Sequence, residues 1–478
     1  MEKRQRIVSL ITGLLFFMML VFPCGAAAEA QGVLAEKDFE YEVHDGYVTI
    51  TGYCGPLNDG LVIPAQIEGL PVRAIAGGAF IESVVSGTLT IPDGVTDIGD
   101  DAFYGCAYLS GDLIIPSSVK TIGDRAFCRG GFTGTLTISD GVEVIGEQAF
   151  WGCEGFNGGL AIPDSVTQIG QAAFYNCNGF DSGLTLSKGV TQIEDYTFYG
   201  CSGLTGGLTI PDGVTQIGYG AFAHCGGLTG ELLCPDNLAA IGEYAFWDCV
   251  GLTALTLPSG VRRIDRGAFN GCTGLGGTLV IPAGVTRIGG GAFSNCPTLS
   301  GLSVAPENVR YYAEGGALIS AAHTLISYAG RQQMEIPQDV TAIGDYAFAR
   351  CAYLTGSLTI PESVTRIDEY AFWGCSGLTG DLTVHGSVKT VGEGAFYDCT
   401  GLKGELIIED GVEELADWAF YDCTGLIMPL KLPASMKNMG NGVFHGCRFN
   451  DLEQLSDEEA VEYSGLLLRA VQRMLDWH

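Results

Sequence analysis

The cysteines have the greatest capacity for chemistry in this sequence, because a thiol can form a disulfide, bind a metal ion or act as a nucleophile. The chain of 478 residues contains 17 of them. Thirteen stand three residues after a recurring phenylalanine and so form one column: Cys106, Cys153, Cys177, Cys201, Cys225, Cys249, Cys272, Cys296, Cys351, Cys375, Cys399, Cys423 and Cys447. In an exported protein this number would usually indicate disulfides.

The regular spacing of the column argues against both disulfides and metal. Stacked neighbours about 5 Å apart are close enough for a disulfide, but their Cβ vectors would be parallel and not convergent. Cysteine also packs well as a small buried apolar residue. We therefore predict buried free thiols, which a reducing habitat would suit, with oxidised neighbour pairs as the alternative. The chain has no Cys-x-x-Cys pair and its six histidines are scattered, so no metal site is predicted.

Aromatic residues form a second column, because Tyr or Trp often follows the recurring phenylalanine directly. Others stand two residues before it, so that pairs such as Tyr196 and Tyr199 would share one side of a short helix. One interpretation is ring packing between repeats. The other is a stripe that stacks on sugar rings or on partner side chains, since Tyr and Trp are favoured binding anchors. The candidate binding residues in this column are Tyr199, Trp247, Trp373 and Tyr421.

Threonine occupies a third column, at the outward position of a predicted strand. Threonine is a good strand residue, which would explain the column without any function. The functional interpretation is a flat, weakly polar surface for a protein partner. Candidate contact residues there are Thr185, Thr209, Thr256, Thr359 and Thr383, and Tyr311 and Tyr312 are candidates in an irregular segment described below.

All three columns depend on a repeat that runs from about residue 72 to residue 447. Its anchors are Phe80, Phe103, Phe127, Phe150, Phe174, Phe198, Phe222, Phe246, Phe269, Phe293, Phe348, Phe372, Phe396, Phe420 and Phe444. Successive anchors are 23 or 24 residues apart, except that Phe293 and Phe348 are 55 apart. A fixed period of this size indicates a solenoid, whereas a propeller blade needs about 40 residues or more.

Within each repeat, Leu-x-Ile closed by Pro predicts a short strand, as in residues 208–211. The following Ile-Gly-x-x-Ala-Phe run predicts a turn and one short helical segment. A single unit cannot bury its apolar face, but stacked units can. About 16 coils at a strand spacing of roughly 4.8 Å would extend on the order of 75 Å.

The consensus Leu-Thr-Ile-Pro-Asp-Gly-Val-Thr-x-Ile-Gly-x-x-Ala-Phe-x-x-Cys-x-x-Leu resembles the repeat of BspA-like bacterial surface leucine-rich-repeat proteins. The resemblance covers residues 72–447, and residues 40–71 resemble the segment that precedes the repeats in that family. It implies a right-handed leucine-rich-repeat coil with a parallel sheet on the concave side. It also implies an exported protein used in adhesion or another protein–protein contact, without catalytic residues.

The remaining segments predict caps and an interruption. Residues 1–30 are predicted to be a signal peptide, with lipidation at Cys24 or retention as an anchor as alternatives. Residues 31–71 are predicted to be an N-terminal β cap, and residues 72–301 and 334–449 the leucine-rich repeats. Residues 302–333 predict an irregular coil with a hairpin insert, serving either as a splice between repeat blocks or as a contact site. Residues 450–478 predict a C-terminal capping helix, with a partner-binding helix as the alternative.

Charge and motifs narrow the function. The net charge of −31 disfavours nucleic acid and anionic membrane surfaces. No catalytic motif interrupts the repeat, so we predict no enzyme activity, no cofactor and no metal. The predicted function is a secreted or cell-surface protein that binds a host or neighbouring-cell protein. The alternatives are glycan binding through the aromatic stripe and a passive structural role at the surface.

Overall fold

Most regular coils contain two short strands, one more than the single strand that we predicted. The Leu-x-Ile segment gives the first series: β6 (Ser86–Thr90), β8 (Leu113–Ile115), β10 (Leu136–Ile138), β12 (Leu160–Ala161), β14 (Leu184–Thr185), β16 (Gly206–Thr209), β18 (Leu228–Leu233), β20 (Leu252–Leu255), β22 (Gly277–Ile281), β24 (Leu299–Val304), β30 (Leu382–Val384), β32 (Gly404–Ile408) and β34 (Leu426–Ile427). Leucine and isoleucine of this segment point inward and the residue between them points outward, as in β8.

The second series lies just before the predicted turn, where an inward Ile, Val, Leu or Met ends each two-residue strand. Its members are β7 (Asp97–Ile98), β9 (Thr121–Ile122), β11 (Val144–Ile145), β13 (Gln168–Ile169), β15 (Gln192–Ile193), β17 (Gln216–Ile217), β19 (Ala240–Ile241), β21 (Arg263–Ile264), β23 (Arg287–Ile288), β28 (Ala342–Ile343), β29 (Arg366–Ile367), β31 (Thr390–Val391), β33 (Glu414–Leu415) and β35 (Asn438–Met439). Paired strands run parallel one repeat apart, so that Ile145 lies opposite Ile122 and Ile169.

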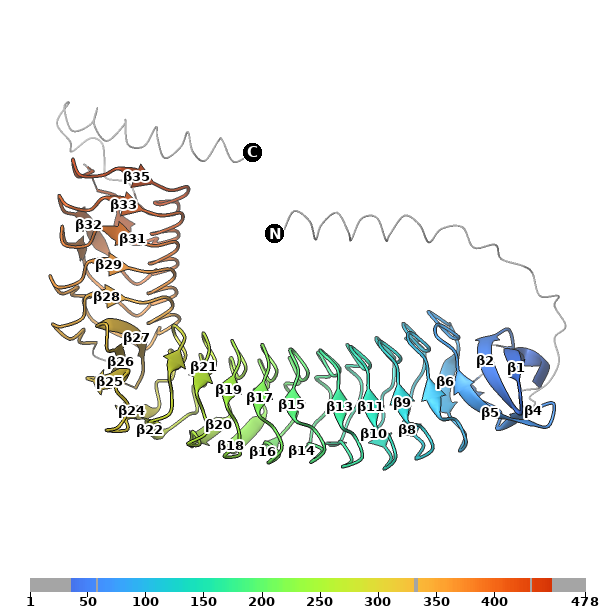
Figure 1. The fold of residues 1–478 in the computed structure, drawn as a ribbon. Helices are drawn as coiled ribbons and strands as arrows, with labels where there is room; N and C mark the ends of the chain where they lie inside the picture. The colour runs from blue at the N-terminus through green and yellow to red at the C-terminus, as the bar shows by residue number, and fades with distance from the viewer. Residues whose placement is uncertain (1–35, 57–58, 331–333, 430–431, 449–478) are drawn as a thin grey trace.

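The computed structural model describes residues 36–56, 59–330, 334–429 and 432–448, which form a bent solenoid of about 16 coils (Figure 1). The predicted signal peptide and the predicted C-terminal helix lie outside these residues. The positions of the other predicted boundaries stay predictions. No helix among the described residues has the length and apolar character needed to cross a bilayer.

The predicted short helical segment is wrong, because the residues around each anchor form turns. The φ angle is positive two residues before and two residues after every anchor, for example at Asp101 (55°) and Gly105 (70°) around Phe103. Left-handed residues cannot continue a right-handed helix. The backbone N–H groups therefore alternate: Phe103 donates to Ala126 of the next coil, and Tyr104 donates back to Asp101. The only helix among the described residues is the 3₁₀ turn η1 (Glu36–Asp38).

The core is a continuous stack of anchor rings. Phe222 is fully buried, and its ring centroid lies 5.2 Å from that of Phe198 and 5.3 Å from that of Phe246. Offset stacking at this spacing is favourable beyond the burial of apolar area. Every anchor of the repeat is buried, so the predicted shared interior is confirmed.

The cysteine column is buried beside this stack, and all its members are free thiols. Each Sγ, except that of Cys351, lies 2.9–3.3 Å from the carbonyl oxygen of an anchor phenylalanine in the preceding coil. A thiol must stay protonated to donate this hydrogen bond, and burial raises the pKa of Cys201 to about 12. The predicted buried free thiols are confirmed, and they join successive coils.

The N-terminal segment covers the open end of the stack with antiparallel structure. It comprises β1 (Phe39–His44), β2 (Tyr47–Tyr53), β3 (Asp59–Val62), β4 (Gln66–Ile67) and β5 (Leu70–Ile75). Strand β2 coincides with the strand predicted at residues 47–53; it pairs antiparallel with β1 and parallel with β5. Strand β5 in turn pairs parallel with β7, and the parallel ladder extends from there along the repeats.

The predicted hairpin insert is present, with one more strand than we predicted. Strands β25 (Tyr311–Glu314), β26 (Ala317–Ser320) and β27 (Thr324–Tyr328) form an antiparallel meander, and β27 pairs parallel with β28. The insert stands between two apolar cores. In β26, Leu318 packs in the core of the first repeat block, whereas Ala317 and Ile319 pack in that of the second.

The solenoid bends at this insert into two arms (Figure 1). We call residues 59–304 the first arm and residues 334–448 the second arm. The anchor turns approach closely here: a Cβ on Gly290 would lie 2.0 Å from the carbonyl oxygen of Asp345. The turns therefore line the inside of the bend, although we expected the parallel sheet on the concave side. Curvature within each arm stays a prediction.

Candidate binding site at the bend

A cavity of about 460 Å³ lies on the anchor turns where the two arms meet. The first arm contributes residues from five successive coils, and the second arm contributes Tyr346 and Trp373. Aromatic rings dominate the lining: Tyr175, Tyr196, Tyr199, Tyr219, Tyr244, Trp247, Tyr346 and Trp373, with Gly220, Ala223, Gly267 and Asn270 between them. We call this the bend cavity. A largely preformed aromatic hollow with a few polar groups is typical of a binding site.

The rings of the bend cavity contact one another in a continuous chain along the first arm. Tyr175 and Tyr199 stack at 4.6 Å, and the Tyr196 ring lies 4.9 Å from that of Tyr219. Tyr244 and Trp247 follow at 5.4 Å. All these side chains are partly exposed. The aromatic column therefore packs coil against coil and also leaves ring surface available to a ligand.

Small residues make room for the cavity at positions that carry large side chains elsewhere. Gly220 and Gly267 stand two residues before their anchors, where Tyr196 and Tyr244 stand in neighbouring coils. The φ angle is positive at all four residues, which glycine adopts without strain. A Cβ on Gly220 would lie 3.1 Å from the Tyr196 ring, and one on Gly267 would lie 2.5 Å from the Tyr244 ring. The glycines thus make room for the tyrosine rings that line the cavity.

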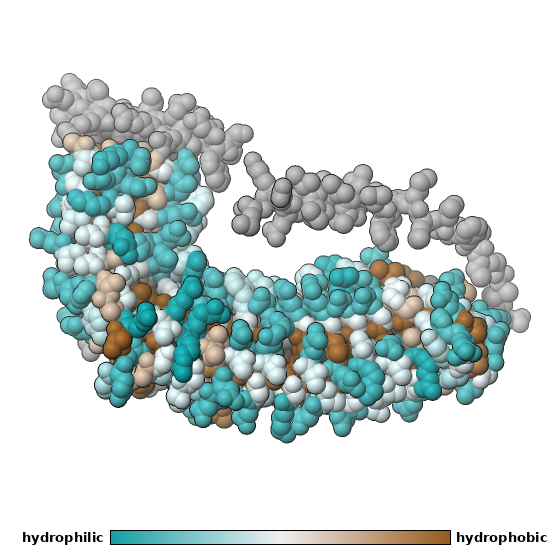
Figure 2. Space-filling model, in the orientation of Figure 1, coloured by the Kyte–Doolittle hydropathy of each residue, from teal (hydrophilic) through white to brown (hydrophobic). Residues whose placement is uncertain are grey.

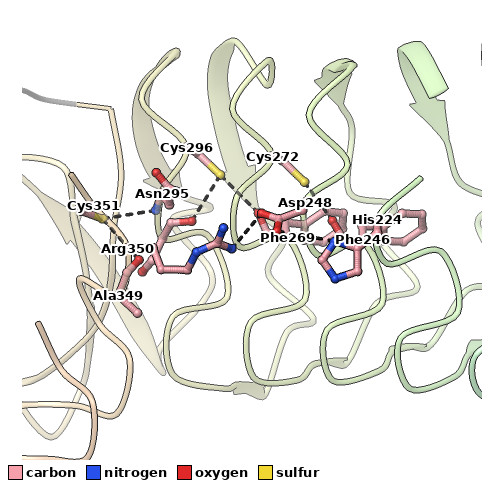
Figure 3. A network of polar contacts seen from close by, with 11 residues as sticks. His224, Phe246, Asp248, Phe269, Cys272, Asn295, Cys296, Ala349, Arg350 and Cys351 are labelled. Carbon is pink, nitrogen blue, oxygen red and sulfur yellow. Dashed lines mark hydrogen bonds and ion pairs between the residues drawn. The ribbon is translucent and has the colours of Figure 1, made fainter. Parts of the chain in front are cut away.

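Charged residues fix the bend beside the cavity (Figure 3). Arg350 Nη1 donates a hydrogen bond of 2.8 Å to Asp248 Oδ1, across 102 residues of chain. The same guanidinium lies 5.5 Å from the centroid of the Trp247 ring, a cation–π contact. Arg350 reaches Asp248 because Gly271, at the equivalent turn position between them, has no side chain. This bond is one of the contacts that join the two arms.

A second arginine repeats the arrangement on the other side of the cavity. The Arg266 guanidinium lies 5.4 Å from the centroid of the Tyr346 ring and 3.3 Å from Glu243 Oε1. It therefore connects the first arm to a residue of the second arm. Both arginines at the cavity are compensated by a carboxylate.

Burial favours the neutral form of three tyrosine hydroxyls at the cavity. Burial raises the pKa of Tyr219 to about 12, with the neighbouring Tyr196 as the next cause. Burial likewise raises the pKa of Tyr244 and of Tyr346. A neutral phenol can donate and accept a hydrogen bond, so these hydroxyls could contact polar groups of a ligand.

The repeat that builds the cavity matches a known family model. The BspA type leucine-rich repeat region matches residues 73–205, 133–229, 191–313 and 327–451, which together cover more than half of the chain. The chain belongs to the BspA-type leucine-rich repeat family. The resemblance to the BspA-like repeat, predicted from the consensus sequence, is confirmed. A search among curated proteins finds none that matches.

Two solved bacterial structures have a similar fold. A leucine-rich cell surface protein from Faecalibacterium prausnitzii A2-165 is 25% identical, with a TM-score of 0.52, over 91% of this chain and 98% of that one. A leucine-rich repeat protein from Bacteroides ovatus ATCC 8483 is 24% identical, with a TM-score of 0.51, over 87% of this chain and 92% of that one. The family model and the first similarity place this chain among BspA-type leucine-rich-repeat proteins.

Of the predicted aromatic binding residues in this BspA-type array, three line the bend cavity and one does not. Tyr199, Trp247 and Trp373 come together there. Tyr421 lies in the second arm, where its ring stacks between Tyr397 at 4.9 Å and His445 at 4.5 Å. The role of each residue in binding stays a prediction, but the structure separates Tyr421 from the other three.

The predicted threonines occupy a different surface of the BspA-type coils. They lie on or beside the first strand series, and none lines the bend cavity. Thr185, Thr209, Thr256 and Thr359 are exposed and Thr383 is half-buried. Exposed apolar residues stand at the equivalent position in other coils: Ile114, Val280 and Ile407. Figure 2 shows hydrophilic residues predominating on one side of the molecule, with a broken band of hydrophobic ones along the first arm.

The two predicted tyrosines of the insert have separate structural partners. The Tyr311 hydroxyl accepts a 2.8 Å hydrogen bond from the backbone N–H of Ile288 and so braces the last coil of the first arm. The Tyr312 hydroxyl donates to Asp339 Oδ2 at 2.5 Å. His323 Nδ1 lies 3.1 Å from the same oxygen. These contacts tie the insert to both arms.

Two sets of polar residues were not predicted from the sequence, because most coils carry an apolar, aromatic or glycine residue at those positions. Asn270 follows its anchor directly, where the other coils of the cavity carry Tyr, Trp or Ala. Glu194 and Asp265 stand four residues before their anchors, where most coils carry Gly. A search for residues that break a column would have found them. Among the described residues, no group of three or more His, Cys, Asp or Glu could hold a metal ion.

Proposed function

We propose that this protein is an exported surface protein that binds another protein through the bend cavity and the surrounding turns. The observation that carries the proposal is the aromatic cavity shared by both arms, because tyrosine and tryptophan are favoured anchors of protein interfaces. The Faecalibacterium neighbour is a leucine-rich cell surface protein, which supports the proposed location. The role is one of binding and not of catalysis.

The solenoid is suited to this role because its turns form a rigid frame. Each anchor turn is hydrogen-bonded to the next coil, as Phe222 is to Ala245, and its phenylalanine is buried in the core. A preorganised aromatic surface loses little conformational entropy on binding. The two arms could then hold a partner on the inside of the bend.

A second candidate function is glycan capture, favoured by one observation. The cavity offers partly exposed faces of Tyr199 and Trp373, and a neutral sugar ring could stack on them. A passive structural role, the third hypothesis from the sequence, predicts no ligand at this surface.

A binding screen with a matched pair of variants distinguishes these functions. The purified protein would be tested against arrays of extracellular-matrix and bacterial surface proteins and against a glycan array. Trp373→Ala removes a ring of the cavity, and Tyr421→Ala removes a ring at the equivalent position outside it. We expect a protein ligand whose binding falls about tenfold or more with Trp373→Ala and stays unchanged with Tyr421→Ala. Binding only to glycans, or equal effects of both variants, would contradict the proposal.

A further inference from the structure

A second hollow adjoins the bend cavity and differs from it in chemistry. It measures about 320 Å³ and is lined by polar residues of the second strand series and the positions that follow, among them Gln192, Glu194, Asp195, Glu243, Arg263 and Asp265. Tyr219 lines both hollows. An aromatic cavity and a carboxylate-bearing surface are therefore continuous, and one ligand could contact both.

The carboxylates of this second hollow are only partly compensated. Asp265 Oδ2 lies 3.2 Å from Arg263 Nε, and Glu243 is paired with Arg266 as described above. Within the described residues, neither Glu194 nor Asp195 makes an ion pair. Asp195 Oδ1 accepts the backbone N–H of Tyr219 at 2.7 Å, and Glu194 contacts the Gln192 amide. The local charge is negative and would attract a cation.

Glu194 also stands where the repeat favours glycine. Four residues before the anchor, Gly218 and Gly242 allow neighbouring backbones to approach so closely that a Cβ would lie within 2.7 Å of the adjacent coil. A glutamate at this position does not serve that packing. The second strand ladder is interrupted beside it, since β13 and β15 are not paired. The fold therefore gives no reason for a carboxylate here.

Asn270 supplies an independent indication of a ligand in the bend cavity. Its side chain lines the cavity and is 4% exposed, and its Oδ1 has no hydrogen-bond partner among the described residues. An unsatisfied buried amide oxygen costs about 1–3 kcal/mol. Ala223 and Ala349 occupy the equivalent position in other coils, so packing does not require asparagine. The free acceptor indicates that a donor group binds beside it.

The same surface already holds a guanidinium of this chain. Arg350 lies against the Trp247 ring and donates to Asp248, as Figure 3 shows for the Asp248 contact. An aromatic face, an oxygen acceptor and a carboxylate together suit a planar, delocalised cation with several N–H donors. The free rings of the bend cavity, Asn270 Oδ1 and Glu194 offer the same three features to a ligand.

We propose that the bend cavity binds an arginine side chain of the partner protein. Its guanidinium would stack on the tyrosine rings around Tyr219 and donate an N–H to Asn270 Oδ1, in the negative field of Glu194 and Asp195. A lysine ammonium is more strongly hydrated and does not stack in this way. A neutral sugar could donate hydroxyl hydrogen bonds to the carboxylates, but it carries no positive charge to match their field. The inference rests on the proposed function, which it narrows to a partner with an exposed arginine.

Ligand-observed saturation-transfer NMR on the full chain tests this with small probes. The first probe is Nα-acetyl-arginine methylamide, and its matched control is the citrulline analogue, which keeps the shape and loses the charge. We expect the arginine probe to bind about tenfold more tightly than the citrulline probe. Asn270→Ala and Glu194→Gln should each weaken the arginine probe about threefold or more, while Glu405→Gln on an exposed strand of the second arm should not change it. Circular dichroism of each variant verifies that it is folded.

Several results would overturn the inference. They are equal binding of the two probes, no binding of the arginine probe, or tighter binding of a chito-oligosaccharide that is lost in the same variants. Failure of the broader proposal gives a different result. A protein partner whose affinity is unchanged by Asn270→Ala and Glu194→Gln would refute the arginine site and leave protein binding intact. Specific binding of the arginine probe without any protein ligand in the screen would refute the proposed function alone.

Discussion

In the middle of the first arm each coil contacts the coil before it and the coil after it, whereas at the bend residues from distant coils meet. The ring of Phe222 packs between those of Phe198 and Phe246, one repeat away on either side. At the bend, Arg350 bonds to Asp248, and the coils of Phe269 and Phe293 lie between them in sequence. A repeat array is usually a sum of nearest-neighbour contacts. The bend departs from that rule, and the aromatic cavity lies at the bend.

The difference teaches that the residues which recur from coil to coil are not the residues that distinguish the two hollows. Residues that recur along the repeat, such as the anchors and the cysteine column, are buried and contact residues of the neighbouring coils. Residues that break a column, such as Asn270 and Glu194, line the two hollows. The insert produces the bend because its β26 packs in both cores at once. The following predictions test whether regular coils and bend differ in energy as they do in geometry.

The largest expected effect is the loss of an anchor ring in the regular stack. Phe222→Ala removes a fully buried side chain with a ring neighbour on each side, and we expect it to lower the free energy of unfolding by about 3–5 kcal/mol. Phe293→Ala at the bend should cost about 1 kcal/mol less, because Phe293 has one anchor neighbour, Phe269 at 5.7 Å. Urea unfolding followed by circular dichroism measures both. A greater loss for Phe293→Ala would contradict the comparison.

The second prediction concerns two glycines of the first arm, both close to the start of the insert. A Cβ on Gly290 would lie 2.0 Å from the backbone oxygen of Asp345, which cannot rotate away, so Gly290→Ala should cost about 2–3 kcal/mol. Gly301 has no atom within 4 Å of a Cβ and no left-handed φ angle. Gly301→Ala should leave stability unchanged or raise it by up to about 1 kcal/mol. Thermal unfolding compares them, and equal melting temperatures would show that the arms are not packed tightly here.

The parts of the fold that could be predicted from the sequence are those whose contacts join equivalent positions of the repeat. The anchors, the buried thiols and the strands β26 and β27 were predictable, because each follows from local pattern or from stacking of equivalent positions. The turn conformation was not, since left-handed φ angles occur at Tyr196 and Trp418 as well as at glycines. A tyrosine or tryptophan side chain does not indicate a left-handed backbone conformation.

The site was less predictable than the fold for a related reason. Equivalent positions specify only which coils are neighbours, whereas the bend depends on an insert without a counterpart in the repeat. Tyr199, Trp247 and Trp373 were identified by residue type, but their convergence on one cavity required the direction of the bend. The threonines share a column with each other and yet lie on another surface. Residues at equivalent positions of the repeat are therefore predicted to share a surface, but not to meet in one binding site.

The third prediction compares two arginine–aspartate pairs of similar geometry. Arg350 joins the two arms, while Arg125 joins neighbouring coils through two hydrogen bonds of 2.7 and 2.8 Å to Asp101. Each substitution to alanine should cost about 1 kcal/mol, because the pairs are partly exposed. Only Arg350→Ala should change the small-angle X-ray scattering profile, since of these two arginines only Arg350 contacts both arms. An unchanged profile for both variants would show that Arg266 and the insert suffice to hold the bend.

The smallest expected effect is a pH dependence confined to the insert. The hydrogen bond from the Tyr312 hydroxyl, and then the contact with His323, hold the pKa of Asp339 below its usual range. A depressed carboxyl pKa contributes stability above the unfolded value of about 3.9 and loses it as the pH falls through the folded pKa. Hydrogen exchange of residues 311–328 should therefore accelerate between pH 5 and pH 3, after correction for the intrinsic rate.

The control for this effect lies in the first arm. Hydrogen bonds from Lys188 also lower the pKa of Asp164, but they join only adjacent coils. Since both carboxylates are largely exposed, we expect a change of about two- to fivefold in exchange rate at each. Acid should loosen the whole meander through Asp339 and a single turn through Asp164. Asp339→Asn should abolish the acid response of the insert; a response that persists in this variant would assign it to other groups and remove the insert's carboxylate from the comparison.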